Sequence, residues 1–170
     1  MNINNVVNSY KYLDVPTKRL VKTWKKLEGP KQIPWTPLTK PIAESTVALL
    51  SSAGLALKTD KPFNQEGERR NPWWGDPSFR VLPRAVKASD VKLYHLHMNS
   101  KLVDQDLNTF FPLQTAIELE VEGVIGNLAD RHYSYMGYIL EPQVLLEESL
   151  PPIIASLKND QVDAVIMVPG

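Results

Sequence analysis

Cysteine is absent from this chain of 170 residues. These residues can therefore form no disulfide, no thiolate metal site and no cysteine nucleophile. A charge of one sign is also lacking, since 19 lysines and arginines balance 19 aspartates and glutamates. Without a net field, the sequence predicts neither nucleic acid nor an anionic membrane as a partner. The locally basic run around Lys22 is typical of a solvated helix face.

Long apolar runs, a secretory signal and a phosphate-binding loop are missing as well. No apolar stretch approaches the roughly 20 residues that cross a bilayer, and the polar start MNINNVVNSY lacks the layout of a signal sequence. No G-x-G-x-x-G or P-loop spacing occurs, so nothing supports a bound nucleotide. The sequence predicts a cytoplasmic protein of one domain, and its hydrophobic fraction of 43% is ordinary for a globular chain.

Hydrophobic spacing divides the chain into an N-terminal helical segment, residues 1–30, and an α/β domain, residues 31–170. In the first, TKRLVKTWKKLEG predicts a short amphipathic helix. In the second, strands are predicted in STVALLSSAGL, VKLYHLHM, residues 131–136 and VDAVIMVP, and helices in PLQTAIELEVEG and EPQVLLEESLPPIIASLKNDQ. We expect Pro151 and Pro152 to kink or break the last helix.

The turn-rich residues 58–83 are expected to form a long connection between the first two strands. Trp73 and Trp74 within it argue against disorder, because such rings pack or bind ligands. The alternation of strands and helices predicts an α/β fold with a mostly parallel sheet covered by helices, in three layers, Rossmann-like or flavodoxin-like. We expect this fold to be incomplete at its C-terminus, because the apolar strand VDAVIMVP requires cover on both faces and otherwise invites self-association.

Two histidines two residues apart are candidates for chemistry. On a strand, His95 and His97 would point to the same side, with Asn99, Asp104 and Asp106 close behind. Imidazole and carboxylate groups suit zinc, iron or manganese. The other interpretation is that one histidine is hydrogen-bonded in the core while the other supports a loop. The sequence leaves both open.

Two further polar clusters have structural alternatives. HYSYMG brings His132 and Ser134 to the end of a strand, but Ser134 lacks the G-x-S-x-G spacing of a nucleophile elbow, so packing of the tyrosines explains the cluster equally well. GDPSFR could place Asp76 and Arg80 against an anionic substrate. An Asp-Pro-Ser turn accounts for the aspartate without a ligand.

Several stretches in this order resemble the family of glycine/sarcosine/betaine reductase component B and the selenoprotein subunit of D-proline reductase. They are STVALLSSAGL, GDPSFRVLP, HLHMN, DQDLNTFFPLQ, GVIGNLADRHYSYMG and VDAVIMVP. Together they cover most of the chain from about residue 33 onward. DLNTFFPLQ and GVIG with HYSYMG are the most specific of them.

The resemblance implies a reductase subunit that cleaves a C–N bond alpha to a carboxylate, in an amino acid such as D-proline or glycine. It implies a pyruvoyl group on a partner subunit that holds the substrate amine, and a thiol or selenol carrier protein. In the family, the strand that resembles VDAVIMVP runs into a selenocysteine or cysteine redox motif. We therefore expect the nucleophile beyond Gly170, hypothesise a UGA codon there, and expect these 170 residues to be inactive alone.

Groups that follow parallel strands meet at one edge of a sheet, which predicts where a pocket lies. His97 or His132 is the expected proton donor to the leaving amine. The expected pocket-lining and substrate-binding residues, with Gly170 beside them, are Asn99, Asp104, Asn108, Ser134, Asp76 and Arg80. Two alternatives remain: a non-catalytic binding protein of the same fold, and a metal-dependent hydrolase or lyase that uses His95, His97 and Asp104.

Overall fold

The computed structural model describes residues 13–28, 36–71 and 74–170, and the chain forms two compact units, Met1–Pro37 and Leu38–Gly170. In the first unit, α1 (Val15–Glu28) confirms the predicted helix, and Asp14 caps it by accepting a hydrogen bond from the Thr17 N–H at 2.7 Å. The predicted division at residue 30 lies outside the described residues and stays a prediction.

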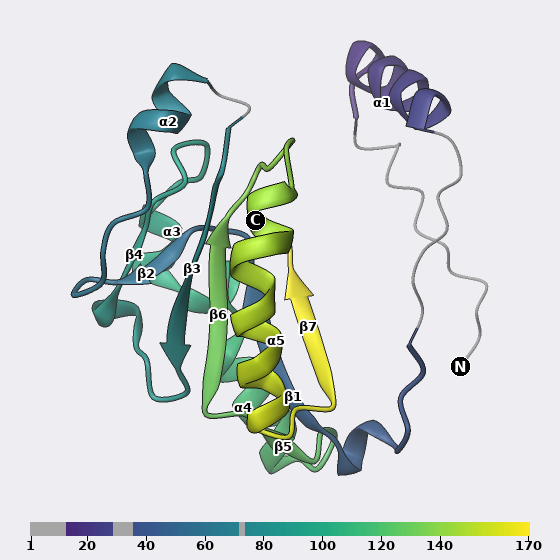
Figure 1. Ribbon diagram of the computed structural model, residues 1–170, viewed down its shortest axis with the longest axis vertical. Coiled ribbons are helices and arrows are strands. Elements are labelled where there is room, and N and C mark those ends of the chain that lie inside the picture. Colours follow the sequence, from purple (N-terminus) through teal and green to yellow (C-terminus); the bar gives the residue numbers. More distant parts are fainter. Residues whose placement is uncertain (1–12, 29–35, 72–73) are drawn as a thin grey trace. The chain divides into compact units, whose positions relative to one another are not determined.

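A five-stranded sheet forms the centre of the second unit (Figure 1). The middle strand β1 (Thr46–Ser51) pairs in parallel with β5 (Asn127–Leu128), β6 (Arg131–Met136) and β7 (Ala164–Val168). Strand β3 (Asp76–Pro83) joins β6 in the antiparallel sense. The sheet is mixed but mostly parallel, which confirms the predicted α/β class.

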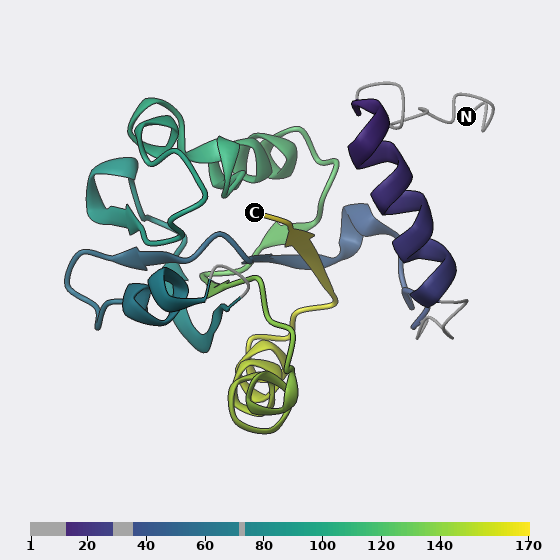
Figure 2. The same cartoon turned by 90° about the horizontal axis from the view of Figure 1, so that it is seen from above.

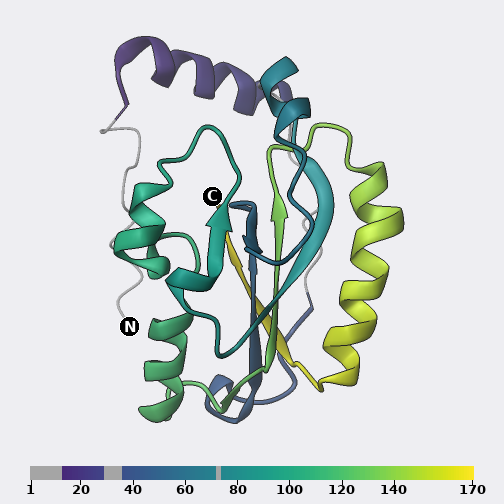
Figure 3. The same ribbon diagram turned by 90° about the vertical axis from the view of Figure 1, so that its left-hand side faces the viewer.

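Helices cover the two faces of this sheet, as Figures 2 and 3 show. On one face Leu49 belongs to the apolar cluster that contains Phe111 and Leu113, where α4 (Leu113–Val121) lies. On the other face, Leu50 packs with Tyr133 and with Ile153 of α5 (Leu150–Asn159). Successive side chains of a strand alternate between faces, so β1 contributes to both halves of the core.

Short elements complete the second unit. They are α2 (Gln65–Arg70), α3 (Lys101–Gln105), the 3₁₀ turns η2 (Ile42–Glu44), η3 (Ala88–Asp90) and η4 (Leu107–Thr109), and a two-stranded antiparallel sheet of β2 (Leu55–Leu57) and β4 (Val91–Leu93). Among the residues that the structure describes, no helix has both the length and the apolar character that a membrane crossing requires.

The strand predicted over VKLYHLHM is wrong in its length and in its place. It ends at Leu93 and pairs only with β2, outside the main sheet. The reason is that the N–H of Leu96 donates to the carboxyl group of Glu68 instead of a neighbouring strand, and that of Met98 donates to the carbonyl of His95. His95 and His97 therefore lie in a turn.

The expected long connection is also corrected, because residues 58–83 contain α2 and β3. Strand β3 contains Pro77 and Pro83 and lies at an edge of the sheet, where a strand tolerates prolines. The prediction of a kink or break at Pro151 and Pro152 meets a change of helix type. The helix does not separate into two pieces there, but a π-helical segment, η5 (Leu145–Ser149), leads directly into α5, whose first turn holds both prolines.

Candidate functional site

The carboxyl ends of β1, β6 and β7 point to the same end of the sheet (Figure 1). There the N–H of Gly170 donates to Oγ of Ser52, just after β1, at 2.9 Å. A Cβ added to Gly170 would lie 2.6 Å from both Cα of Ala53 and Cε of Met98, so the backbone of Gly170 fits closely between these two residues. We call Ser52, Ala53, Met98 and Gly170 the carboxyl edge.

Ser134 lies on β6 directly opposite Ser51 of β1 and is fully buried. Its Oγ accepts a hydrogen bond from the N–H of Leu55 at 2.9 Å, and Oγ of Ser51 donates to the carbonyl of Phe110 at 2.8 Å. Both hydroxyls thus hold backbone segments at the ends of the strands. The predicted position of Ser134 near a strand end is observed, and its hydroxyl is engaged in this structural contact.

Three other predicted pocket residues lie in or just before α3 and η4. Oδ1 of Asn99 accepts from the N–H of Lys101 at 3.1 Å, and Oδ1 of Asn108 accepts from the N–H of Thr115 at 3.3 Å. Asp104 lies in the first turn of α3 and is exposed. Asn99 directly follows Met98 of the carboxyl edge, but no contact within the described part of the chain joins Asn99, Asp104 or Asn108 to Ser134.

Asp76 and Arg80 connect β3 to the segment before α2 through hydrogen bonds. The carboxyl group of Asp76 accepts hydrogen bonds from the N–H of Asn64 at 2.8 Å and from Ser78. Arg80 donates through Nε to the carbonyl of Lys61 at 2.8 Å, and its guanidinium lies 4.2 Å from the ring centroid of Phe63. Both side chains are therefore engaged with the protein itself.

His132 lies in the core rather than at the carboxyl edge. Its side chain is fully buried in β6, where Nδ1 accepts a hydrogen bond from the N–H of Leu49 at 3.0 Å and the ring meets Phe111 edge-on. Burial, with a smaller effect from Arg84, lowers the pKa of His132 to about 4. The imidazole is therefore neutral at pH 7, and no hydrogen-bond partner for its Nε2 occurs among the described residues.

His95 and His97 gather instead around Glu68 of α2, whose carboxyl group is almost fully buried, at 2% exposure. Nδ1 of His95 lies 2.7 Å from Oε1 of Glu68, and Nε2 of His97 lies 3.8 Å from the same oxygen. Burial lowers the pKa of His95, and the nearby Glu68 partly opposes this shift. We call Glu68, His95 and His97 the histidine cluster.

Sequence reasoning missed Glu68, although it organises this cluster. The residue lies 28 positions before Leu96, whose N–H it binds, in the polar helix QEGERR. Glu66 of the same helix is exposed and pairs with Arg69 and Arg70. Nothing in the amino-acid pattern distinguishes these two glutamates, because only the packing of α2 turns one of them inward.

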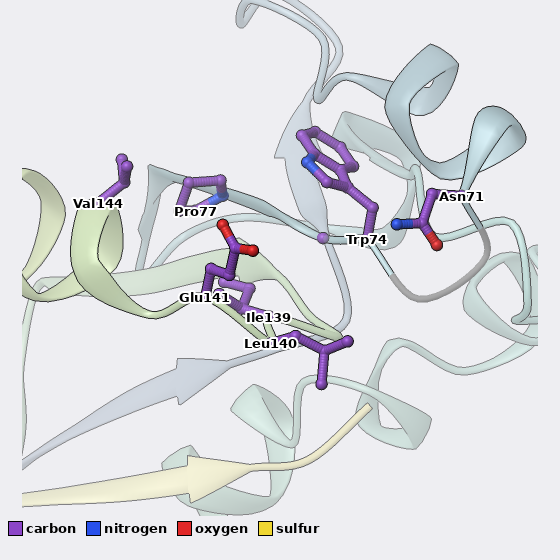
Figure 4. Close-up of a pocket in the computed structure, with 8 residues that line it drawn as sticks. Asn71, Trp74, Pro77, Ile139, Leu140, Glu141 and Val144 are labelled. Atoms are coloured by element: carbon purple, nitrogen blue, oxygen red, sulfur yellow. The ribbon is translucent and has the colours of Figure 1, made fainter.

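A pocket of about 260 Å³ opens where β6 ends and β3 begins (Figure 4). Asn71 and Trp74 line one side of it, and Ile139, Leu140 and Glu141 line another. The ring of Trp74 lies against Gly67 of α2. None of the predicted site residues lines this pocket. Trp74 does so, which fits the expectation that a tryptophan here packs or binds, while Trp73 lies outside the described residues.

Within residues 13–28, 36–71 and 74–170, no three histidine, aspartate or glutamate side chains are grouped so that they could hold a metal ion. Glu68 and the two histidines converge, but one carboxyl oxygen is already shared between them and the N–H of Leu96. The alternative of a metal-dependent enzyme built on His95, His97 and Asp104 therefore has no geometric support here.

The fold and the polar groups near the carboxyl edge define an α/β protein of the open-sheet kind, whose sites lie where parallel strands end. A sequence model of the family described as glycine/sarcosine/betaine reductase selenoprotein B (GRDB) matches residues 19–169. The chain belongs to this family of amino-acid reductase subunits, which confirms the resemblance found in the sequence.

A curated relative is the D-proline reductase subunit gamma of Acetoanaerobium sticklandii. It is 36% identical to this chain over 136 residues, which make up 80% of this chain and 53% of the relative. The chain thus spans about half the length of the relative that it matches. No solved structure matches the chain.

Proposed function

We propose that this chain is the selenoprotein-B-like part of a reductase that cleaves a C–N bond of an amino acid such as D-proline or glycine. The observation that carries the proposal is the family match, which extends to residue 169 at the end of β7. The position of Gly170 between Ala53 and Met98 supports it, because catalytic groups of open α/β sheets gather where parallel strands end.

In this proposal the nucleophilic selenocysteine or cysteine follows residue 170 in the chain. A soft nucleophile of this kind and an electron sink, here a pyruvoyl group on a partner subunit, together make cleavage of a C–N bond possible. The residues of this chain contribute the surface on which that nucleophile is held. Ser52, Ala53 and Met98 contact Gly170, the residue that precedes the nucleophile in this proposal.

His97 is the proposed proton donor to the leaving amine. Its side chain is about half exposed, and its Nε2 lies 3.8 Å from the buried carboxyl group of Glu68. The proposal leaves His132 out of this role, since that ring is enclosed in the core and neutral at pH 7. Substrate binding by Asn99, Asp104, Asn108, Ser134, Asp76 and Arg80 stays a prediction, as does the cytoplasmic location.

Exposed apolar side chains on β7 support a subunit role. Val165, Ile166 and Met167 are 36%, 41% and 67% exposed, and apolar patches of this kind mark sites of association. We propose that partners of the chain include a pyruvoyl-bearing subunit and a thiol or selenol carrier protein. A non-catalytic binding role within the same reductase is the alternative, and it is favoured by the engagement of Ser134, Asp76 and Arg80 in structural contacts.

The codon that follows Gly170 tests the proposal directly. We expect UGA, followed by a reading frame that encodes a cysteine within a few residues. In the protein produced with selenocysteine at that codon, and mixed with its pyruvoyl-bearing partner and a dithiol, we expect reduction of D-proline or of glycine. A UAA or UAG codon with no cysteine-bearing frame beyond it contradicts the proposal.

The role of His97 is tested in the same complete protein. We expect His97→Gln to lower turnover at least tenfold, because a positioned proton donor contributes about 100-fold or more to a rate. Lys101→Gln is the matched control, since Lys101 is a charged, exposed residue of the adjacent helix. Unchanged turnover in His97→Gln removes this histidine from the mechanism.

A further inference from the structure

Glu68 is a buried acidic side chain on α2, whose other charged residues are exposed. Its side chain is only 1% exposed, whereas that of Glu66 on the same helix is 57% exposed. An acidic group without partners in such a place is costly. Three N–H donors or imidazole nitrogens surround Glu68, from Leu96, His95 and His97, so the turn after β4 encloses it.

The contacts of Glu68 determine which nitrogen of His95 carries the proton. Both carboxyl oxygens already accept the N–H of Leu96, at 3.1 and 3.0 Å. The contact of 2.7 Å between Oε1 and Nδ1 of His95 favours a proton on Nδ1. The N–H of His97 donates to the same Nδ1 at 3.4 Å, an arrangement that needs the other tautomer, and the much shorter distance to Glu68 is the reason for choosing the Nδ1–H form.

A neutral histidine with its proton on Nδ1 has a free lone pair on Nε2. In the part of the chain that the structure describes, the one fully buried imidazole nitrogen without a partner belongs to His132. No hydrogen bond to Nε2 of His95 occurs there, and the side chain of His95 keeps 9% of its surface exposed. The backbone of His95 is connected to the carboxyl edge, because its carbonyl accepts a hydrogen bond from the N–H of Met98. The side chain of Met98 in turn contacts Gly170.

We propose that Glu68 and His95 form a carboxylate–imidazole pair in which Nε2 of His95 accepts a proton, with Glu68 as its positioning residue. A proton passes from a selenol, thiol or ammonium group to Nε2, and the electron pair of the broken bond stays on selenium, sulfur or nitrogen. The resulting imidazolium keeps Nδ1–H on Glu68, whose negative charge stabilises it. Return of the proton to the group that released it, or its loss to water, restores the neutral ring.

The identity of the group that supplies this proton rests on the proposed function. The Glu68–His95 pair itself does not depend on that function. Burial holds the pKa of His95 below its ordinary value, which keeps the ring neutral at pH 7 and ready to accept a proton. The titratable groups that face His95 are Glu68 from α2 and His97 from its own turn. A purely structural role for Glu68, fastening the turn to α2, is the competing explanation.

Nuclear magnetic resonance of the 170-residue chain with 15N-labelled histidine tests the pair. We expect His95 of the wild type to show the Nδ1–H tautomer at pH 7. In Glu68→Gln, whose amide oxygen still accepts hydrogen bonds, we expect the titration midpoint of His95 to move to lower pH. We also expect acylation of Nε2 by diethyl pyrocarbonate at pH 7 to slow at least threefold.

Glu66→Gln is the matched control, since it removes the same charge from the exposed side of α2, and we expect it to change neither the midpoint nor the acylation rate. An Nε2–H tautomer in the wild type overturns the proposal without any variant, even if Glu68→Gln does not fold. An unmoved midpoint in a folded Glu68→Gln protein also overturns it and leaves only the structural role. None of these measurements needs turnover, so failure of the proposed function is seen separately.

Discussion

Strands β1 and β7 are parallel neighbours of similar apolar composition, and they differ sharply in exposure. They pair from Val47 opposite Ala164 to Ser51 opposite Val168. Val47, Ala48 and Leu49 of β1 have no exposed surface, whereas Val165, Ile166 and Met167 of β7 are 36%, 41% and 67% exposed. An apolar strand is therefore buried by what lies beside and above it, and not by its own sequence.

The neighbours of the two strands explain this difference. β1 pairs with β5 and β6 along one side and with β7 along the other, and helices α4 and α5 cover the two faces near it (Figure 2). β7 lies at an edge of the sheet, with one paired side. Only its first residue, Ala164, packs against the main apolar core. Under the proposed function, the rest of β7 is the surface offered to a partner subunit.

The sharpest test of the comparison uses Leu49 and Ile166, which lie opposite each other on β1 and β7. We expect Leu49→Ala to lower the free energy of unfolding by about 2–5 kcal/mol, because it leaves a cavity in a closed core. Ile166→Ala should cost less than about 1.5 kcal/mol, since part of that side chain already meets water. Urea denaturation of both variants measures this, and equal losses would contradict the comparison.

The hydrogen bond between Leu49 of β1 and His132 of β6 should make the free energy of unfolding depend on pH. His132 holds the N–H of Leu49, and its pKa is lowered to about 4 in the folded chain from 6.5. The unfolded chain therefore binds the proton more tightly, and stability falls as the pH falls from 6.5 to 4. The loss from this group is about 3 kcal/mol, and it is complete below pH 4.

Urea denaturation at a series of pH values checks this dependence. His132→Asn is the matched variant, because an asparagine oxygen can accept the N–H of Leu49 without titrating in this range. We expect the slope between pH 6.5 and 4 to shrink in His132→Asn. The remaining slope should come from other titrating groups, among them His95, whose pKa is lowered too. An unchanged slope would mean that His132 titrates normally.

A smaller contrast is expected between two serines that receive backbone hydrogen bonds. Ser134→Ala leaves the buried N–H of Leu55 without an acceptor and should cost about 1–3 kcal/mol. Ser52→Ala removes the acceptor of the exposed Gly170 N–H, which water can replace, and should cost less than about 0.5 kcal/mol. Thermal unfolding compares the two. A larger loss from Ser52→Ala would show that the carboxyl edge is closed to water.

The smallest effect on stability is expected at Met167, the most exposed of the three β7 residues. Met167→Glu should change the free energy of unfolding of the isolated chain by about 0.5 kcal/mol or less. A charge on an exposed edge strand opposes association, so we expect weaker self-association in analytical ultracentrifugation at high protein concentration. A marked loss of stability would place Met167 in a core.

Much of the sheet could be predicted from the sequence, because short continuous apolar runs favour strands of a parallel sheet. β1 and β7 were predicted in this way. β6 was predicted over residues 131–136, and α4 and α5 were predicted as helices. β3 was missed because its prolines are acceptable only at an edge, and being at an edge is a property of the assembled sheet. The strand through His95 was predicted from alternation alone. It ends at Leu93 because the N–H of Leu96 donates to Glu68 instead of to a neighbouring strand.

The candidate site was less predictable than the fold. His95 and His97 stood out in the sequence, and the family resemblance pointed to the end of β7. Only the tertiary structure shows that His132 lies in the core and that Glu68 contacts His95. Motifs report residue types, whereas the role of an imidazole depends on its solvent access and on the group that holds its other nitrogen.

The amino-acid sequence by itself determined the α/β class, the family and the lack of any thiol among these residues, since composition, hydrophobic period and motif order are properties of the linear chain. Only the tertiary structure decided that β1 is buried while β7 is exposed, that Gly170 meets Ala53 and Met98, and that Glu68 joins His95. Solvent access and contacts between distant residues arise when the strands pair and the helices cover them, and no local pattern encodes either.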